Sequence, residues 1–201
     1  MPSSAEPVIS LPGVRAQITV QRGRLMNPGP EPDLKRALHP VPSYERAVRE
    51  VSRMLAAAGI RHALVGALGA NAYRSRPRTT EDIDFLVGDE AFEKHPGGFV
   101  TMRVPVVEFD GIDVDQVPLT EALRVVEDGL ERAPMSEGVP IAPVDTIVVM
   151  KLLAGRTQDL ADVEAIVDSG ADRELLRSAV RKALPRAAET LERLFANVDR
   201  S

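Results

Sequence analysis

Two aspartates one residue apart, Asp82 and Asp84, are the residues of this chain best suited to chemistry. They lie in the run Asp-Ile-Asp-Phe-Leu-Val, residues 82–87, whose β-branched and aromatic residues predict a strand. Side chains two apart on a strand point to one face, so both carboxylates project together while Ile83 and Phe85 enter the core. Paired carboxylates repel each other unless a cation lies between them, and Mg²⁺ prefers such oxygen ligands. The pair predicts a magnesium site; a solvated edge of the sheet is the alternative interpretation.

A strand, a turn and a helix upstream must position this pair. Residues 60–65 predict a short apolar strand, and Gly66 turns the chain into a helix expected over residues 67–73. A strand that enters a helix through a small residue leaves backbone N–H groups free to bind a phosphate. The loop that follows carries three arginines, Arg74, Arg76 and Arg78. The turn suits a phosphate-binding site beside the acidic pair; an ordinary α/β turn without a ligand is the alternative.

This stretch resembles the signature of the polymerase-beta-like nucleotidyltransferase superfamily, in which a small-residue turn opens a helix and Arg-x-Thr-x-Asp-x-Asp follows. The matching positions here are Gly66, Ala67, Arg78, Thr80, Asp82 and Asp84. The family usually has Gly-Gly or Gly-Ser at the turn, so Ala67 lacks a hydroxyl that could contact a phosphate. The resemblance implies an α+β fold with a small mixed β-sheet flanked by helices and a helical C-terminal part.

A third carboxylate is expected on a neighbouring strand, because the two metal ions of nucleotidyl transfer need at least three acidic ligands. Asp110-Gly111 is a hairpin signal between strands predicted at residues 100–109 and 112–117. The second strand carries Asp113 and Asp115 on one face. We predict Asp115 as the third ligand, because it lies in an apolar strand as the family's third acid does. Asp113 is the alternative.

A second constellation follows a predicted helix at residues 144–154 and opens another helix at Thr157. It resembles the Lys-x-x-Ala…Lys-Asp-x-x-Asp segment of nucleotidyltransferase toxins from bacterial toxin–antitoxin and abortive-infection systems. In that group the lysine contacts the nucleotide phosphates and the first aspartate is needed for activity; the matching residues are Lys151 and Asp159, with Asp162 one turn beyond. Gln158 replaces the usual Arg or Lys, which leaves one phosphate contact unassigned. A Lys151 that only extends to the surface is the alternative.

The resemblance, which covers residues 59–167, implies a Mg²⁺-dependent nucleotidyltransferase that uses two metal ions and moves a nucleoside monophosphate from an NTP to an acceptor hydroxyl. It further implies the tRNA 3′ end as acceptor, a toxin role and a cognate antitoxin protein as partner. Two alternatives stay open: the same chemistry on a small molecule or a protein, and a non-catalytic nucleotide-binding module. The residues assigned are Asp82, Asp84 and Asp115 for metal; Gly66, Ala67, Arg78, Thr80 and Lys151 for the nucleotide; and Asp82, Asp84, Lys151 and Asp159 for catalysis.

Composition limits the classes of protein and partner. The formal net charge of −5 argues against a generally basic nucleic-acid binder, so RNA binding would need a local patch such as Arg173, Arg177 and Arg181, which otherwise form a solvated helix face. The chain has no cysteine, which excludes disulfides and thiolate metal sites. It has no apolar run long enough to span a membrane and no signal-peptide pattern at the N-terminus. We therefore expect a cytoplasmic protein that does not bind membranes.

Three segments are expected along the chain. Residues 1–42 hold half of the 16 prolines and predict an N-terminal arm, with a weak edge-strand pattern at residues 14–20. Residues 43–132 should form the nucleotidyltransferase core, which opens with a helix capped by Ser43 and ends with a helix at residues 119–132. Residues 133–201 should form a helical part that closes the cleft.

Overall fold

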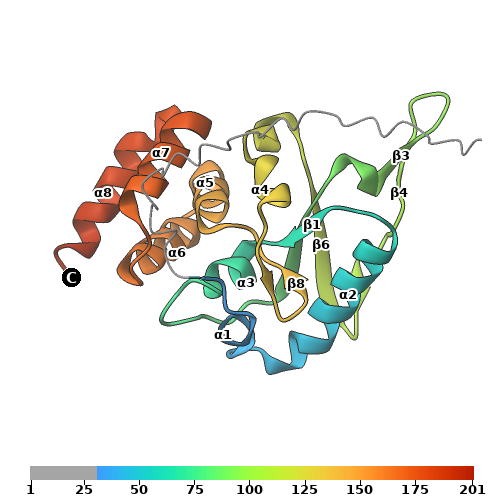
Figure 1. Cartoon of the computed structure of the whole chain (residues 1–201), viewed down its shortest axis with the longest axis horizontal. Helices are drawn as coiled ribbons and strands as arrows, with labels where there is room; N and C mark the ends of the chain where they lie inside the picture. The colour runs from blue at the N-terminus through green and yellow to red at the C-terminus, as the bar shows by residue number, and fades with distance from the viewer. Residues whose placement is uncertain (1–30) are drawn as a thin grey trace, which may run out of the picture.

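A four-stranded mixed β-sheet forms the centre of the computed structural model, which describes residues 31–201 (Figure 1). Its strands, in spatial order, are β1 (His62–Leu64), β2 (Asp82–Val87), β6 (Ile112–Pro118) and β5 (Glu108–Phe109). β2 pairs antiparallel with β1 and parallel with β6, and β5 returns antiparallel to β6 through the predicted hairpin turn. The predicted α+β class with a small mixed sheet is confirmed.

Strand β2 is an inner strand of the sheet and contains the predicted acidic pair. Ile83 and Phe85 are fully buried, whereas Asp82 and Asp84 are half-buried on the opposite face. This alternation is the one expected from the period of two in a strand. The acidic pair is thereby attached to a rigid backbone with core packing beneath it.

Three helices of the first half pack around this sheet. They are α1 (Leu34–Leu38), α2 (Glu45–Ala57) and α3 (Gly66–Asn71). α3 packs on β2 and on α1, and α2 packs on β1 and on the hairpin formed by β7 (Met135–Ser136) and β8 (Val139–Pro140). The short α3 therefore packs against the acidic strand, and its first residue, Gly66, lies against the side chain of Asp84.

The C-terminal helices gather at one end of the molecule, opposite the hairpin of β3 (Phe92–Lys94) and β4 (Val100–Met102) (Figure 1). They are α5 (Val144–Ala154), α6 (Thr157–Asp168), α7 (Arg173–Ala183) and α8 (Ala188–Val198). α5 is buried on nearly all sides, because it contacts α3, α6 and α7. One hydrophobic cluster extends from Leu34 to Phe195, across both expected segment boundaries. The division at residues 42 and 132 stays a prediction. No helix within residues 31–201 is both long and apolar enough to cross a bilayer.

Three local expectations differ from the structure. Residues 100–109 form two strands, because Pro105 lacks the N–H that a continuous ladder needs. Residues 119–132 form a 3₁₀-helix (Glu121–Val126) and the short α4 (Asp128–Glu131), a segment in which Gly129 lowers helix propensity. Ser43 lies within a 3₁₀-turn that begins at Pro42, so it does not cap α2. The strand expected at residues 14–20 lies outside the described residues.

Candidate functional site

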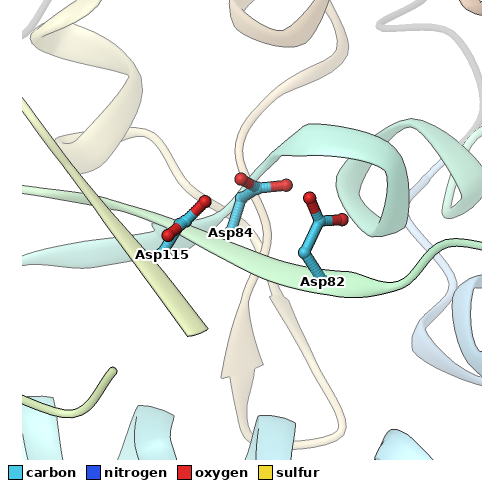
Figure 2. A group of neighbouring side chains, drawn as sticks. All are labelled: Asp82, Asp84 and Asp115. Atoms are coloured by element: carbon cyan, nitrogen blue, oxygen red, sulfur yellow. The ribbon is translucent and has the colours of Figure 1, made fainter. Parts of the chain in front are cut away.

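Asp82, Asp84 and Asp115 come together at one edge of the paired strands β2 and β6 (Figure 2). One carboxylate oxygen of each lies within 4.8 Å of those of the other two. The parallel register places Asp84 beside Asp115 and Asp82 beside Asp113, yet the exposed Asp113 does not join this group. All three donors are carboxylate oxygens, the ligands that Mg²⁺ prefers, so the donor set fits the predicted metal.

The surroundings of Asp84 disfavour its charged form. Burial raises the pKa of Asp84 to about 6, with further contributions from the charges of Asp82 and Asp115, against which Lys151 and Arg156 act. A carboxylate so perturbed in a cavity is typical of a functional site. Thr80, which the sequence assigned to the nucleotide, donates its hydroxyl to a carboxylate oxygen of Asp82 and thereby orients that side chain.

Gly66 provides the space that Asp84 occupies. Its φ of +61° lies in the left-handed region, and a Cβ built there would lie 1.7 Å from Oδ2 of Asp84. The neighbouring Val65 N–H donates to the carbonyl of Asp84 at 2.9 Å, which ties the turn to β2. Gly66 therefore suits both the backbone of the turn and the close approach of the Asp84 carboxylate.

Replacement of Gly66 by alanine should lower stability and displace Asp84. A non-glycine residue at positive φ costs about 1–3 kcal/mol, and the clash with Asp84 adds to this cost. The matched control is Gly111→Ala, because Gly111 has a φ of +78° and a Cβ at that position would meet no atom within 4 Å. We expect urea denaturation to show a loss for Gly66→Ala at least about 1 kcal/mol larger than for Gly111→Ala. Equal losses would contradict the close contact with Asp84.

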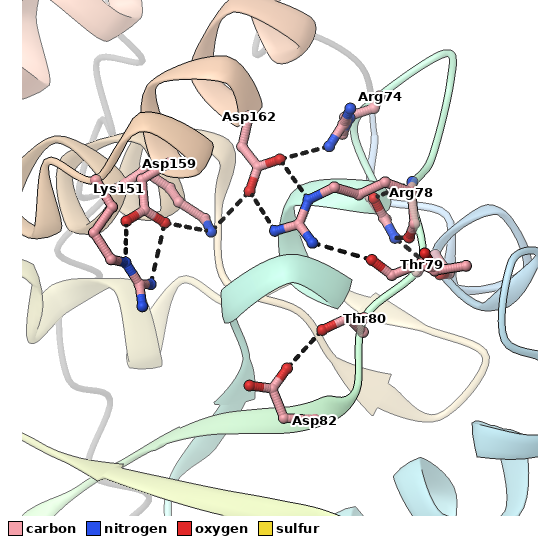
Figure 3. A network of polar contacts seen from close by, with 11 residues as sticks. Arg74, Arg78, Thr79, Thr80, Asp82, Lys151, Asp159 and Asp162 are labelled. Carbon is pink, nitrogen blue, oxygen red and sulfur yellow. Dashed lines mark hydrogen bonds and ion pairs between the residues drawn. The ribbon is translucent and has the colours of Figure 1, made fainter.

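A second polar group lies beside the acids and centres on Asp162 of α6 (Figure 3). This fully buried carboxylate accepts hydrogen bonds from Arg74 Nη1 at 2.6 Å and from Arg78 Nε and Nη2 at 2.9 and 3.0 Å, and Lys151 Nζ lies 2.9 Å away. Burial alone would raise the pKa of Asp162, but the hydrogen bonds from Arg78 and Lys151 hold it below its usual value. Asp162 is therefore an anion that fixes three cations.

Asp159 extends this network toward the solvent. It accepts a hydrogen bond from Lys151 Nζ at 2.8 Å and one from Arg156 Nε at 2.7 Å. Four cations thus surround two carboxylates, which leaves an excess of two positive charges next to Asp82, Asp84 and Asp115. The site is divided into an acidic wall on the sheet and a basic wall on the helices.

One cavity of about 710 Å³ joins the two walls. Every residue that the sequence assigned to the site lines it: Gly66, Ala67, Arg78, Thr80, Asp82, Asp84, Asp115, Lys151 and Asp159. Apolar side chains of α5 and β6, among them Val117, Ile147 and Met150, complete the lining. The structure brings the assigned residues together, while their roles in binding and catalysis stay predictions.

The sequence interpretation missed three participants in this site. It gave no role to Asp162 as the common partner of three cations, and it did not single out Arg156 or the contact of Arg74. The spacing contained part of the signal, because residues 156, 159 and 162 are three apart and share one face of the helix. The contacts of Arg74 and Arg78 cross more than 80 residues of sequence and had no local signal.

No protein-family model and no curated protein matches the chain. Among solved structures, the chain is similar to an antigenic nucleotidyltransferase-like protein from Paracoccidioides brasiliensis, with a TM-score of 0.42 and 15% sequence identity. That match covers 76% of this chain and 93% of the other. We therefore base the proposed function on the residues of the site.

Proposed function

We propose that this protein is a Mg²⁺-dependent nucleotidyltransferase, which moves a nucleoside monophosphate from an NTP to an acceptor hydroxyl. The observation that carries the proposal is a single cavity with three clustered carboxylates on one wall and excess positive charge on the other. Asp82, Asp84 and Asp115 would hold Mg²⁺, and the basic wall suits a triphosphate. Bound Mg²⁺ would neutralise phosphate charge and increase the nucleophilicity of the acceptor hydroxyl.

The residues of the basic wall suit binding better than proton transfer. Arg78 donates three of its N–H groups to Asp162 and to the Thr79 carbonyl, so its guanidinium is held in a fixed orientation at the cavity. Burial would raise the pKa of Asp159, but hydrogen bonds from Arg156 and Lys151 hold it below its usual value. A carboxylate with a lowered pKa is a poor general base at neutral pH. We propose that Asp159 positions Lys151, which faces the phosphates.

The acceptor proposed from the motif is the tRNA 3′ end, which would make the protein the toxin of a toxin–antitoxin pair. Two of the three arginines in the basic stripe expected to help bind RNA have other contacts in the fold. Arg173 pairs with Asp199, Arg177 pairs with Glu192, and both guanidinium groups lie over the ring of Phe195. These two arginines hold α7 against α8, which leaves the exposed Arg181 as the cation of the stripe that faces solvent. The proposal for tRNA therefore rests mainly on the motif.

A second candidate is a cationic small molecule or protein as acceptor. It is favoured by the acidic surface beside the metal group. Glu108 and Asp113 are paired across β5 and β6, both are exposed, and Asp113 neighbours Asp82 on β2. Burial raises the pKa of Tyr44, and the charges of Asp82, Glu81 and Asp113 raise it further. A surface of this sign repels nucleic-acid phosphates and attracts cations.

Transfer of label from the α-phosphate of an NTP tests the function and separates the candidates. Each of the four NTPs, labelled in turn, is incubated with the protein, Mg²⁺ and one acceptor: tRNA, a hydroxylated polycationic small molecule, or a mixture of basic proteins. We expect Mg²⁺-dependent labelling of one acceptor class, and EDTA should abolish it. Binding of Mg²⁺–NTP without labelling would indicate the non-catalytic module, and absence of binding would show that the proposed function is wrong.

A further inference from the structure

Three cations line the described cavity, and they differ sharply in exposure. The side chain of Arg156 is 77% exposed, against 28% for Arg78 and 8% for Lys151. Lys151 bridges two buried carboxylates, and Arg78 is bonded to Asp162 through two nitrogens. Arg156 is thus the cation of this cavity that has room to move.

The backbone presents Arg156 at the mouth of the site. Gly155 ends α5 in the left-handed conformation, with a φ of +66°, and Arg156 is extended before the first residue of α6. The hydrogen bonds and charge of Asp159 raise the pKa of Arg156, and the charges of Asp84 and Asp82 contribute to the same shift. The guanidinium therefore lies within electrostatic reach of the carboxylates proposed to hold the metal.

The ion pair of Arg156 can be exchanged without leaving a buried charge alone. Asp159, its partner, keeps the hydrogen bond from Lys151 Nζ at 2.8 Å when the guanidinium leaves. The side chain of Arg156 is 77% exposed, so water can solvate the guanidinium when it leaves, and exchange is less costly than for a cation that is itself buried. Withdrawal of Lys151 would instead remove a cation from two fully buried carboxylates, a change that is strongly unfavourable.

We infer that, when a nucleoside triphosphate enters the cavity, Arg156 leaves Asp159 and binds the phosphates of the nucleotide. This inference rests on the proposed function. Arg156 lines the cavity, and its planar guanidinium suits bidentate contact with phosphate oxygens. Lys151 and Arg78 form the fixed part of the basic wall, and Arg156 is the movable part.

Binding of inorganic tripolyphosphate with Mg²⁺ tests this role. Tripolyphosphate has no nucleoside, so the measurement includes neither nucleotidyl transfer nor recognition of a nucleobase. Isothermal titration calorimetry compares wild type with Arg156→Gln, and AMP serves as a ligand without the two outer phosphates. Loss of a charge-assisted contact should weaken tripolyphosphate binding roughly 10- to 100-fold. AMP binding should change less than about threefold. Arg156→Lys, which keeps the charge but loses the planar group, should recover part of the affinity.

Arg76→Gln is the matched control, because Arg76 is an exposed arginine that lies outside the cavity lining. It changes the net charge equally and should bind tripolyphosphate as wild type does. Unchanged binding by Arg156→Gln, or an equal loss in Arg76→Gln, would overturn the inference while the proposed function stands. If wild type binds neither Mg²⁺–tripolyphosphate nor any Mg²⁺–NTP, the proposed function fails and the inference fails with it.

Discussion

Asp84→Asn should abolish nucleotidyl transfer, with a loss of about a thousandfold or more, and should make the metal-free protein more stable at neutral pH. The loss of transfer follows from removal of the central carboxylate of the proposed metal group. The gain in stability follows from the raised pKa of Asp84, because ionisation of this carboxyl is unfavourable in the folded state. Both effects come from one side chain and are measured independently.

The gain in stability for Asp84→Asn should grow as pH rises. The pKa of Asp84 is about 6 in the folded protein against an ordinary value of 3.8, so this residue contributes stability below about pH 4 that is lost as pH rises through 6. Asp84→Asn lacks that loss. Without divalent cations, its free energy of unfolding should exceed that of wild type by on the order of 2 kcal/mol at pH 8, and the difference should shrink toward pH 4.

Urea denaturation in EDTA at pH 4.5 and pH 8 measures the stability effect, and labelled NTP measures transfer. Asp113→Asn is the matched control, because Asp113 lies on the same strand as Asp115 but outside the metal group. It should keep transfer. If Asp84→Asn retained near wild-type turnover with Mg²⁺, the metal assignment would be wrong; if Asp113→Asn lost transfer as well, the choice of Asp115 as third ligand would be wrong.

The second large effect is on folding. Asp162→Ala should lower the free energy of unfolding by about 3–5 kcal/mol, because it removes the common partner of Arg74, Arg78 and Lys151. The side chains of Arg74 and Lys151 are only 12% and 8% exposed, so solvent cannot replace the lost carboxylate. Burial already lowers the pKa of Arg74, although the charge of Asp162 opposes this shift. Without Asp162, no carboxylate of the described residues would offset the cost of burying the Arg74 charge.

Asp168→Ala provides the comparison, since Asp168 is an exposed aspartate at the end of the same helix. It should change stability by less than about 0.5 kcal/mol. Urea denaturation at pH 7 compares the two variants with wild type. A loss below about 1 kcal/mol for Asp162→Ala would show that the cations find other partners, and the fixed basic wall would then not exist as described.

Several parts of the site were determined by local sequence. The alternation of Asp82, Ile83, Asp84 and Phe85 sets which side chains enter the core, because a strand has a period of two and one face is buried. The predicted helix at residues 144–154 agrees with α5, and α6 begins at Thr157 as expected. Strand alternation and helix bounds depend on residues that are close in the sequence, so they can be predicted without knowledge of the tertiary structure.

Only the tertiary structure decided which distant residues meet. Asp113 and Asp115 share one face of β6, so the pattern of alternation could not choose between them, and only three-dimensional packing places Asp115 with Asp82 and Asp84. In the same way, the sequence predicts Arg177 as an exposed cation on α7. In the structure, the packing of α8 brings Glu192 Oε1 to 2.7 Å from Arg177 Nε. Ion pairs and metal groups depend on distances between side chains, and a sequence pattern specifies periodicity but not those distances.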